Sequence, residues 1–240
     1  RIAQASAYAD KLDPDIIITI DSPGFAHRFI KRLRRRRAPR VHYVAPSVWA
    51  WKPGRVHKFK RSFDHLLALL PFEPPYFEAV GLPCHFVGHS ILESGADQGD
   101  GAGFRSRHGI AADETLLCLL PGSRKGEVNR LAGDFTQALD RLRARLPSLK
   151  IVLPAVTHLH PLLVDRFQEQ RDLLIVGQEE KFDAMAASNL ALAASGTVAL
   201  ELALARVPTV IAYKIAPLTY ALVRRMVKID LVHLVNILLD

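Results

Sequence analysis

Short apolar runs alternate along the chain with longer segments in which apolar residues recur every three or four positions. Runs of this length are typical of strands buried on both faces of a parallel sheet, and the periodic segments between them predict amphipathic helices. The predicted strands are residues 16–20, 41–44, 65–70, 84–87, 116–120, 150–153, 173–176, 190–193 and 210–213. Such βα alternation predicts parallel sheets with right-handed crossovers.

A stretch without periodicity interrupts this alternation. Residues 93–103 read ESGADQGDGAG and have the Gly, Asp and Ser content of a linker. We therefore expect two Rossmann-like domains, residues 1–92 and residues 104–240, joined by this linker. A cleft between such domains is a natural ligand site.

The most informative segment, LLCLLPGSRKGEVN, begins at Leu116 and predicts a strand, a tight glycine turn and a helix. A helix N-terminus presents unpaired N–H groups and the positive end of a dipole, which favour an anion. Ser123, Arg124 and Lys125 add a hydroxyl and two cations, so a phosphate site is one interpretation. An ordinary βα turn with exposed basic residues explains the PGSR tetrapeptide equally well.

A second turn of the same design, Ala194-Ser195-Gly196-Thr197, follows a later strand. Two such helix N-termini favour a shared diphosphate. Glu201 lies four residues after Thr197, on the same helix face about one turn along, where a carboxylate can accept both hydroxyls of a ribose. The pattern favours a nucleoside diphosphate. The chain has neither GxGxxG nor GxxxxGK[ST], which argues against dehydrogenases and P-loop NTPases.

In the first half, Asp21 follows the β-branched strand directly. An acidic residue at the carboxyl end of a parallel strand suits a ligand site, but Asp21 or Ser22 equally suits a cap of the next helix. His89 follows a later strand, where it suits a general base, a ligand contact or a hydrogen-bonded structural histidine. Asp13-Pro14-Asp15 matches a metal-binding Asp-x-Asp string; because it precedes its strand, we interpret it as a turn.

The net charge of +8 is unevenly distributed. Basic residues cluster at Arg28, Lys31, Arg32, Arg34, Arg35, Arg36, Arg37 and Arg40. The cluster suits nucleic acid, acidic lipid headgroups or a phosphorylated substrate, or is a solvated helix end. Cys84 and Cys118 have no CxxC companion, so we expect a reducing compartment and no disulfide or zinc site. No apolar run approaches the ~20 residues of a membrane span.

Seven segments together resemble the lipid-A-disaccharide synthases, inverting glycosyltransferases of the two-Rossmann GT-B type. In order, they are IDSPGFAHRFIKRL, HYVAPSVWAWKPGRV, LPFEPPYF, VGHS, LLPGSRKGEVNRL, AASGTVALELAL and YKIAPLTY with RRMVKIDLVHLVNIL. They cover almost the whole chain, and YVAPSVWAW with LPFE and LPGSR is a highly specific combination. The resemblance implies a GT-B fold and an enzyme of lipid A and lipopolysaccharide biosynthesis in a Gram-negative bacterium.

The implied reaction joins UDP-2,3-diacylglucosamine to 2,3-diacylglucosamine 1-phosphate (lipid X). The products are a β-1,6-linked lipid A disaccharide 1-phosphate and UDP. Asp21 matches the family's general base, and Arg124 would stabilise the UDP leaving group. The implied nucleotide contacts are Gly122, Ser123, Arg124, Ser195, Gly196, Thr197 and Glu201. We also expect substrate contacts from His89 and from Asn236, whose LVN segment departs from the commoner LPN.

The resemblance further implies no cofactor or metal, a cytoplasmic enzyme peripheral on the inner face of the inner membrane, and a homodimer of the intact protein. The chain begins at Arg1 without methionine, so we expect a fragment truncated at both ends. Two alternatives stay open: a UDP-sugar 2-epimerase or other GT-B enzyme on soluble sugars, and a basic nucleic-acid-binding protein. Because aromatic and basic residues lie mostly in separate segments, we expect no nucleic-acid partner.

Overall fold

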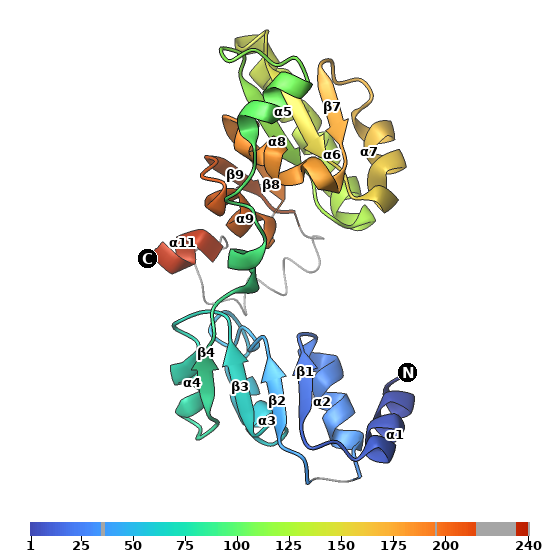
Figure 1. The fold of residues 1–240 in the computed structure, drawn as a ribbon, viewed down its shortest axis with the longest axis vertical. Coiled ribbons are helices and arrows are strands. Elements are labelled where there is room, and N and C mark those ends of the chain that lie inside the picture. Colours follow the sequence, from blue (N-terminus) through green and yellow to red (C-terminus); the bar gives the residue numbers. More distant parts are fainter. Residues whose placement is uncertain (35–36, 195, 215–233, 240) are drawn as a thin grey trace. The chain divides into compact units, whose positions relative to one another are not determined.

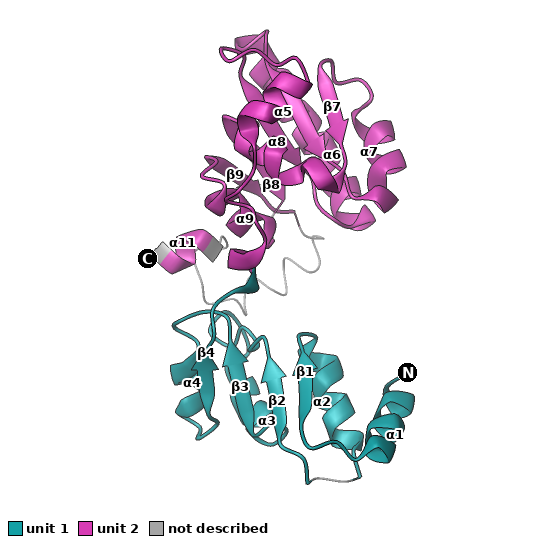
Figure 2. Ribbon diagram, in the orientation of Figure 1, with its two compact units in different colours: residues 1–90, 218–230 teal, residues 91–217, 231–240 magenta. Residues whose placement is uncertain are grey.

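The computed structural model describes residues 1–34, 37–194, 196–214 and 234–239. These residues form two compact α/β units: unit 1 contains residues 1–90, and unit 2 contains residues 91–214 and 234–239 (Figures 1 and 2). Each unit has its own parallel sheet, so the predicted fold class of two Rossmann-like domains is confirmed. The helix expected near residues 218–227 lies outside the described residues.

Unit 1 contains a four-stranded sheet in the order β1-β2-β3-β4, with helices in the crossovers. Its strands are β1 (Ile17–Ile20), β2 (Arg40–Tyr43), β3 (His65–Ala68) and β4 (Cys84–Phe86). Its helices are α1 (Ile2–Leu12), α2 (Pro23–Arg32), α3 (Arg55–Lys60) and α4 (Pro74–Glu78). Asp13, at φ 49°, ends α1, which agrees with the turn predicted at the Asp-x-Asp string.

One face of this sheet packs against the core and the other is more open. Thr19, His42, Leu66 and Cys84 lie in register on the covered face, above a core that includes Phe59, Phe63 and Phe77. On the opposite face of β1, Ile18 and Ile20 are exposed. The prediction of a buried strand over residues 16–20 is therefore wrong: β1 has one covered face, and its residues alternate in burial.

Unit 2 contains a five-stranded parallel sheet in the order β7-β6-β5-β8-β9, and core clusters lie on both of its faces. Its strands are β5 (Leu116–Leu120), β6 (Lys150–Pro154), β7 (Leu173–Val176), β8 (Leu190–Ala194) and β9 (Thr209–Ala212). Its α-helices are α5 (Gly101–Arg107), α6 (Lys125–Arg145), α7 (His160–Phe167), α8 (Lys181–Ala187), α9 (Val198–Leu204) and α11 (Leu234–Leu239). Short 3₁₀ turns are η1 (Ser90–Glu93), η2 (Thr157–Leu159) and η3 (Gln178–Glu180). Every residue of the central strand β5 is buried, including Cys118, so both faces of the strand are covered as predicted.

The segment predicted as a linker packs against unit 2 instead. Ala96 is fully buried, and Asp100 accepts a hydrogen bond from Gly103 N at the start of α5. A Cβ atom on Gly99 would collide with the carbonyl oxygen of Phe182, so the absence of a side chain permits this close approach. The division between the units falls between Ser90 and Ile91 rather than within residues 93–103. Gly99 and Gly101 thus permit close packing against α8, whereas Gly95 has open space around it.

Candidate functional site

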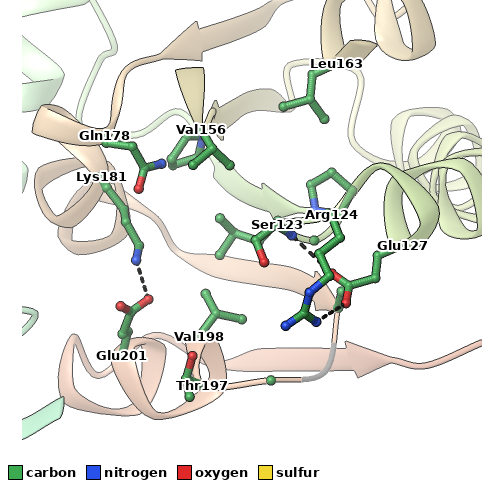
Figure 3. A pocket seen from close by; sticks show the side chains of 16 residues that line it. Ser123, Arg124, Glu127, Val156, Leu163, Gln178, Lys181, Thr197, Val198 and Glu201 are labelled. Carbon is green, nitrogen blue, oxygen red and sulfur yellow. Dashed lines mark hydrogen bonds and ion pairs between the residues drawn. The ribbon is translucent and has the colours of Figure 1, made fainter. Parts of the chain in front are cut away.

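The strand order of unit 2 reverses between β5 and β8. From β5 the chain continues to β6 on one side, whereas β8 pairs with β5 on the other, with Leu120 opposite Ala193. In open α/β sheets, ligands bind outside the carboxyl ends of the strands at such a reversal. A cavity of about 400 Å³ opens there (Figure 3). Its lining residues are Leu120, Pro121, Gly122, Ser123, Arg124, Glu127, Pro154, Val156, Leu163, Gln178, Lys181, Ala194, Gly196, Thr197, Val198 and Glu201.

The turn between β5 and α6 forms one wall of this cavity. Gly122 has φ 121°, and a Cβ atom there would lie 2.8 Å from Glu127 Cβ. Ser123 N donates to Glu127 Oε2 at 3.2 Å, and Arg124 Nη1 donates to Glu127 Oε1 at 2.8 Å. Glu127 therefore folds back over the turn from the third position of α6. The sequence interpretation missed Glu127, although an acidic residue three positions after an N-cap is a recognisable capping signal.

The turn between β8 and α9 forms the facing wall. Gly196 has φ 153°, and Thr197 occupies the N-cap position of α9 without a side-chain capping hydrogen bond. Ser195 lies outside the described residues. The structure thus brings six of the predicted nucleotide-binding residues to one cavity: Gly122, Ser123, Arg124, Gly196, Thr197 and Glu201.

Glu201 is held by a residue that the sequence interpretation missed. Lys181, the first residue of α8, places its Nζ 2.5 Å from Glu201 Oε2, and the two side chains are 18% and 13% exposed. Lys181 Nζ also lies 5.1 Å from the centre of the Phe182 ring. No local sequence pattern indicates Lys181. It reaches the cavity because α8, which it begins, packs against β5 and β6.

The two sides of the cavity differ in chemistry. Figure 3 shows Arg124, Ser123 and Glu127 on one side and Lys181 with Glu201 on the other. The Arg124 side chain is 80% exposed, so it is free of packing constraints and suits an anion. The carboxylate of Glu201 has acceptor positions that ligand hydroxyls could use. The arrangement can therefore hold a ligand with an anionic part at one end and hydroxyls at the other.

Asp21 and His89 both lie at the carboxyl edge of the unit 1 sheet. Asp21 is exposed, directly after β1, with φ 50°. Ser22 occupies the N-cap of α2 with φ 46° but makes no side-chain capping hydrogen bond, so a capping role of its hydroxyl is not observed. His89 follows β4, three strands away from β1 in the sheet, or about 14 Å at the usual strand spacing. Partial burial lowers the pKa of His89.

The tryptophan loop and the LPFE segment meet at the same edge. Trp49 Nε1 donates to Glu73 Oε1 at 3.2 Å, and Leu70 N donates to Glu73 Oε2 at 3.1 Å. Glu73 is 2% exposed, and desolvation raises its pKa against the opposing effect of these hydrogen bonds. Trp49 also makes an edge contact with Phe72. One buried carboxylate thus joins two loops that follow different strands, a role that the sequence interpretation did not assign.

Two predictions change in detail. Arg40 makes a bidentate ion pair with Asp64, Nη2 to Oδ1 at 2.9 Å and Nε to Oδ2 at 3.0 Å, so it is not part of an exposed basic cluster. Arg28, Lys31, Arg32, Arg34 and Arg37 are exposed, and Arg35 and Arg36 lie outside the described residues. Asn236 is exposed on α11, which packs against α9, and it does not line the cavity.

Comparison with known sequences shows the family of the chain. The sequence profile of the lipid-A-disaccharide synthetase family matches residues 2–240. The chain belongs to this family. The lipid-A-disaccharide synthase of Rhodospirillum centenum is 54% identical over 244 residues, covering 100% of this chain and 61% of that protein. That of Paramagnetospirillum magneticum is 45% identical over 245 residues, covering 100% of this chain and 63% of that protein. The chain of this family member thus spans about three fifths of the length of the curated relatives it matches.

Solved structures share the fold of this lipid-A-disaccharide synthetase family member. The S. aureus MnaA–UDP co-structure has a TM-score of 0.65 at 12% identity, covering 99% of this chain and 69% of that one. The UDP-GlcNAc 2-epimerase of Neisseria meningitidis, bound to UDP-GlcNAc, has a TM-score of 0.63 at 11% identity, covering 92% of this chain and 65% of that one. At this identity the likeness supports the two-Rossmann architecture alone. Among the described residues, no helix has the length and apolar content needed to cross a membrane.

Proposed function

We propose that the protein containing this chain is a glycosyltransferase that joins UDP-2,3-diacylglucosamine to 2,3-diacylglucosamine 1-phosphate. The products are the β-1,6-linked lipid A disaccharide 1-phosphate and UDP. The observation that carries the proposal is family membership across residues 2–240, together with a cavity at the strand-order reversal of unit 2. Six of the predicted nucleotide-binding residues line that cavity.

The donor nucleotide fits the chemistry of this cavity. Arg124, at the N-terminus of the 21-residue helix α6, supplies a cation and a favourable dipole end for the diphosphate. Glu201 accepts hydrogen bonds from the ribose hydroxyls. In the structure, Arg124 Nη1 lies 2.8 Å from Glu127 Oε1. Because the Arg124 side chain is exposed, it can turn toward a bound diphosphate. The S. aureus protein of the same fold was solved with UDP, which agrees with a nucleotide as the ligand of this fold.

The proposed transfer breaks the bond between the anomeric carbon and the diphosphate oxygen. The 6-hydroxyl oxygen of the acceptor attacks the anomeric carbon, and UDP leaves with the bonding electron pair. Asp21, exposed at the end of β1, takes the hydroxyl proton as general base. Arg124 stabilises the charge that develops on the leaving diphosphate. Inversion at the anomeric carbon follows from attack opposite the leaving group.

The test incubates the intact protein with UDP-2,3-diacylglucosamine and lipid X and follows disaccharide formation by thin-layer chromatography. We expect product with the natural protein, and its loss with Arg124→Ala and with Asp21→Ala. Lys150→Ala is a matched control, because Lys150 pairs with Glu114 and Asp172 at the amino end of β6 and does not line the cavity. Disaccharide formation unaffected by Arg124→Ala and Asp21→Ala would contradict the assigned roles.

A second candidate function is epimerisation of a UDP-sugar at C2, since UDP-GlcNAc 2-epimerases share the fold. The two candidates diverge in the same assay. An epimerase converts a soluble UDP-sugar in the absence of lipid X and forms no disaccharide. Family membership and the curated relatives favour the synthase.

The exposed basic residues of α2 and the loop after it support a peripheral position on the inner face of the inner membrane. Arg28, Lys31 and Arg32 are exposed on α2, and Phe25, stacked on Phe29, is also exposed on this helix. Anionic headgroups attract such clusters by about 1 kcal/mol per cation. Neutralising the three cations should weaken binding to anionic vesicles, and unchanged binding would remove this part of the proposal. A homodimer of the intact protein also belongs to the proposal.

A further inference from the structure

We infer that Lys181 is a positioning residue that fixes the carboxylate of Glu201 for the ribose of the bound nucleotide. The inference rests on the proposed function, because it assigns the ribose end of the same cavity. Lys181 belongs to neither of the two glycine turns that form the walls of the cavity. The structure brings Lys181 to the cavity from the start of α8, and Glu201 comes from α9.

The ion pair between these residues is built differently from the other ion pair in the cavity. Lys181 and Glu201 are 18% and 13% exposed, whereas Arg124, which pairs with Glu127, is 80% exposed. A half-buried carboxylate is costly without a partner, and a single ammonium contact restricts its orientation. Arg124 can therefore leave Glu127 for a ligand, but Lys181 and Glu201 lose more by separating. The Lys181 pair suits a fixed element of the site.

The geometry leaves Glu201 able to accept ligand hydroxyls while it is paired. Lys181 Nζ contacts Oε2 at 2.5 Å, and an ionised carboxylate has about four acceptor positions on its two oxygens. Lys181 Nζ also lies over the Phe182 ring, 5.1 Å from the ring centre, so a cation–π contact helps to hold it in place. Figure 3 places this pair across the cavity from Ser123 and Arg124, so Lys181 lies away from the turn that suits the diphosphate.

This arrangement predicts that Lys181 affects recognition of the ribose rather than of the phosphates. A residue that contacts the diphosphate directly acts equally on a ribonucleotide and on its 2′-deoxy analogue. A residue that positions Glu201 acts on the ribonucleotide alone. The ratio of the two affinities therefore separates a positioning role from a phosphate contact and from a general structural role.

The experiment measures dissociation constants of UDP and 2′-deoxy-UDP by isothermal titration calorimetry on the intact protein and its Lys181→Met variant. We expect the natural protein to prefer UDP by about tenfold or more, the worth of one hydrogen bond to a charged group. In Lys181→Met this preference should fall to about twofold or less, with little change in 2′-deoxy-UDP affinity. Lys181→Arg, which keeps a cation, should restore most of the preference. Lys150→Met is the matched control and should retain it.

Other outcomes overturn the inference. If Lys181→Met weakens the binding of UDP and of 2′-deoxy-UDP equally, Lys181 contacts the phosphates or supports folding instead. If both affinities stay unchanged, Lys181 has no role in nucleotide binding. Lys181→Met leaves the largely buried carboxylate of Glu201 without its cation, so this variant could fail to fold. In that case the double variant Lys181→Met with Glu201→Gln is tested instead. The double variant should show no more discrimination than Glu201→Gln alone. If the natural protein does not bind UDP at all, the proposed function itself fails.

Discussion

Acidification should destabilise unit 1 through a histidine that the fold keeps neutral. His42 is fully buried on β2, with Phe59 and Phe63 packed around its ring and Nδ1 2.7 Å from Thr19 Oγ1. Desolvation lowers its pKa from 6.5 to about 4, and the carboxylate of Asp21 opposes this only in part. Below pH 6.5 the unfolded chain therefore binds a proton that the folded chain does not.

The size of the effect follows from the difference between the pKa of His42 in the unfolded chain and its pKa in the folded chain. A tenfold change in proton affinity corresponds to about 1.36 kcal/mol, so lowering the pKa from 6.5 to about 4 gives a loss of about 3 kcal/mol. The loss begins near pH 6.5 and is complete near pH 4, because below that value both states are protonated. His27 adds a loss of the same sign: burial lowers its pKa to about 4, and Lys58, Lys31 and Arg61 contribute to the lowering.

Tryptophan fluorescence isolates unit 1 in this measurement. The chain has two tryptophans, Trp49 and Trp51, and both lie in unit 1. Urea unfolding followed by their emission at pH 8, 6.5, 5 and 4 gives the free energy of unfolding of this unit at each pH. The matched variant is His42→Leu, which removes the titrating group and keeps an apolar side chain between the two phenylalanines. Between pH 8 and pH 4, the free energy of unfolding of the variant should fall by about 3 kcal/mol less than that of the natural protein. Equal pH dependence in both proteins would refute the reasoning.

Three further predictions concern the sites at the sheet edges. Asp21→Asn should abolish disaccharide formation while keeping the UDP affinity within about twofold of the natural protein. If the variant turns over at the full rate, another residue is the general base. Gly122→Ala should lower the free energy of unfolding of unit 2 by about 1–2 kcal/mol, because Gly122 has a positive φ. It should also weaken UDP binding, because the added methyl group displaces Glu127. Urea unfolding measures the first effect and calorimetry the second. Glu73→Ala should lower the free energy of unfolding of unit 1 by about 2 kcal/mol or more, since Trp49 Nε1 and Leu70 N lose their acceptor. A red shift of tryptophan emission should accompany this loss. Unchanged stability and emission would contradict the role of Glu73.

The turns at the candidate site were predictable because they are local. An apolar run, a glycine and a periodic segment specify strand, turn and helix over about fifteen residues, and both glycine turns of unit 2 have this form. The spacing of Thr197 and Glu201 likewise follows from helix geometry. The specific segments that identify the family are contiguous stretches of sequence as well. These features required no knowledge of which strands are neighbours.

Only the tertiary structure decided which of these local elements meet. The sequence does not state that β8 pairs with β5, yet that pairing makes the two turns the walls of one cavity. Lys181 reaches Glu201 through a crossover, and Glu73 reaches Trp49 across two loops, so neither contact leaves a periodic signal. Gly99 and Gly101 show the converse: a composition that predicts a linker also allows close packing, because α8 lies beside these two glycines. Local pattern fixes the conformation of a segment, whereas burial and strand order, which depend on contacts distant in sequence, fix its neighbours.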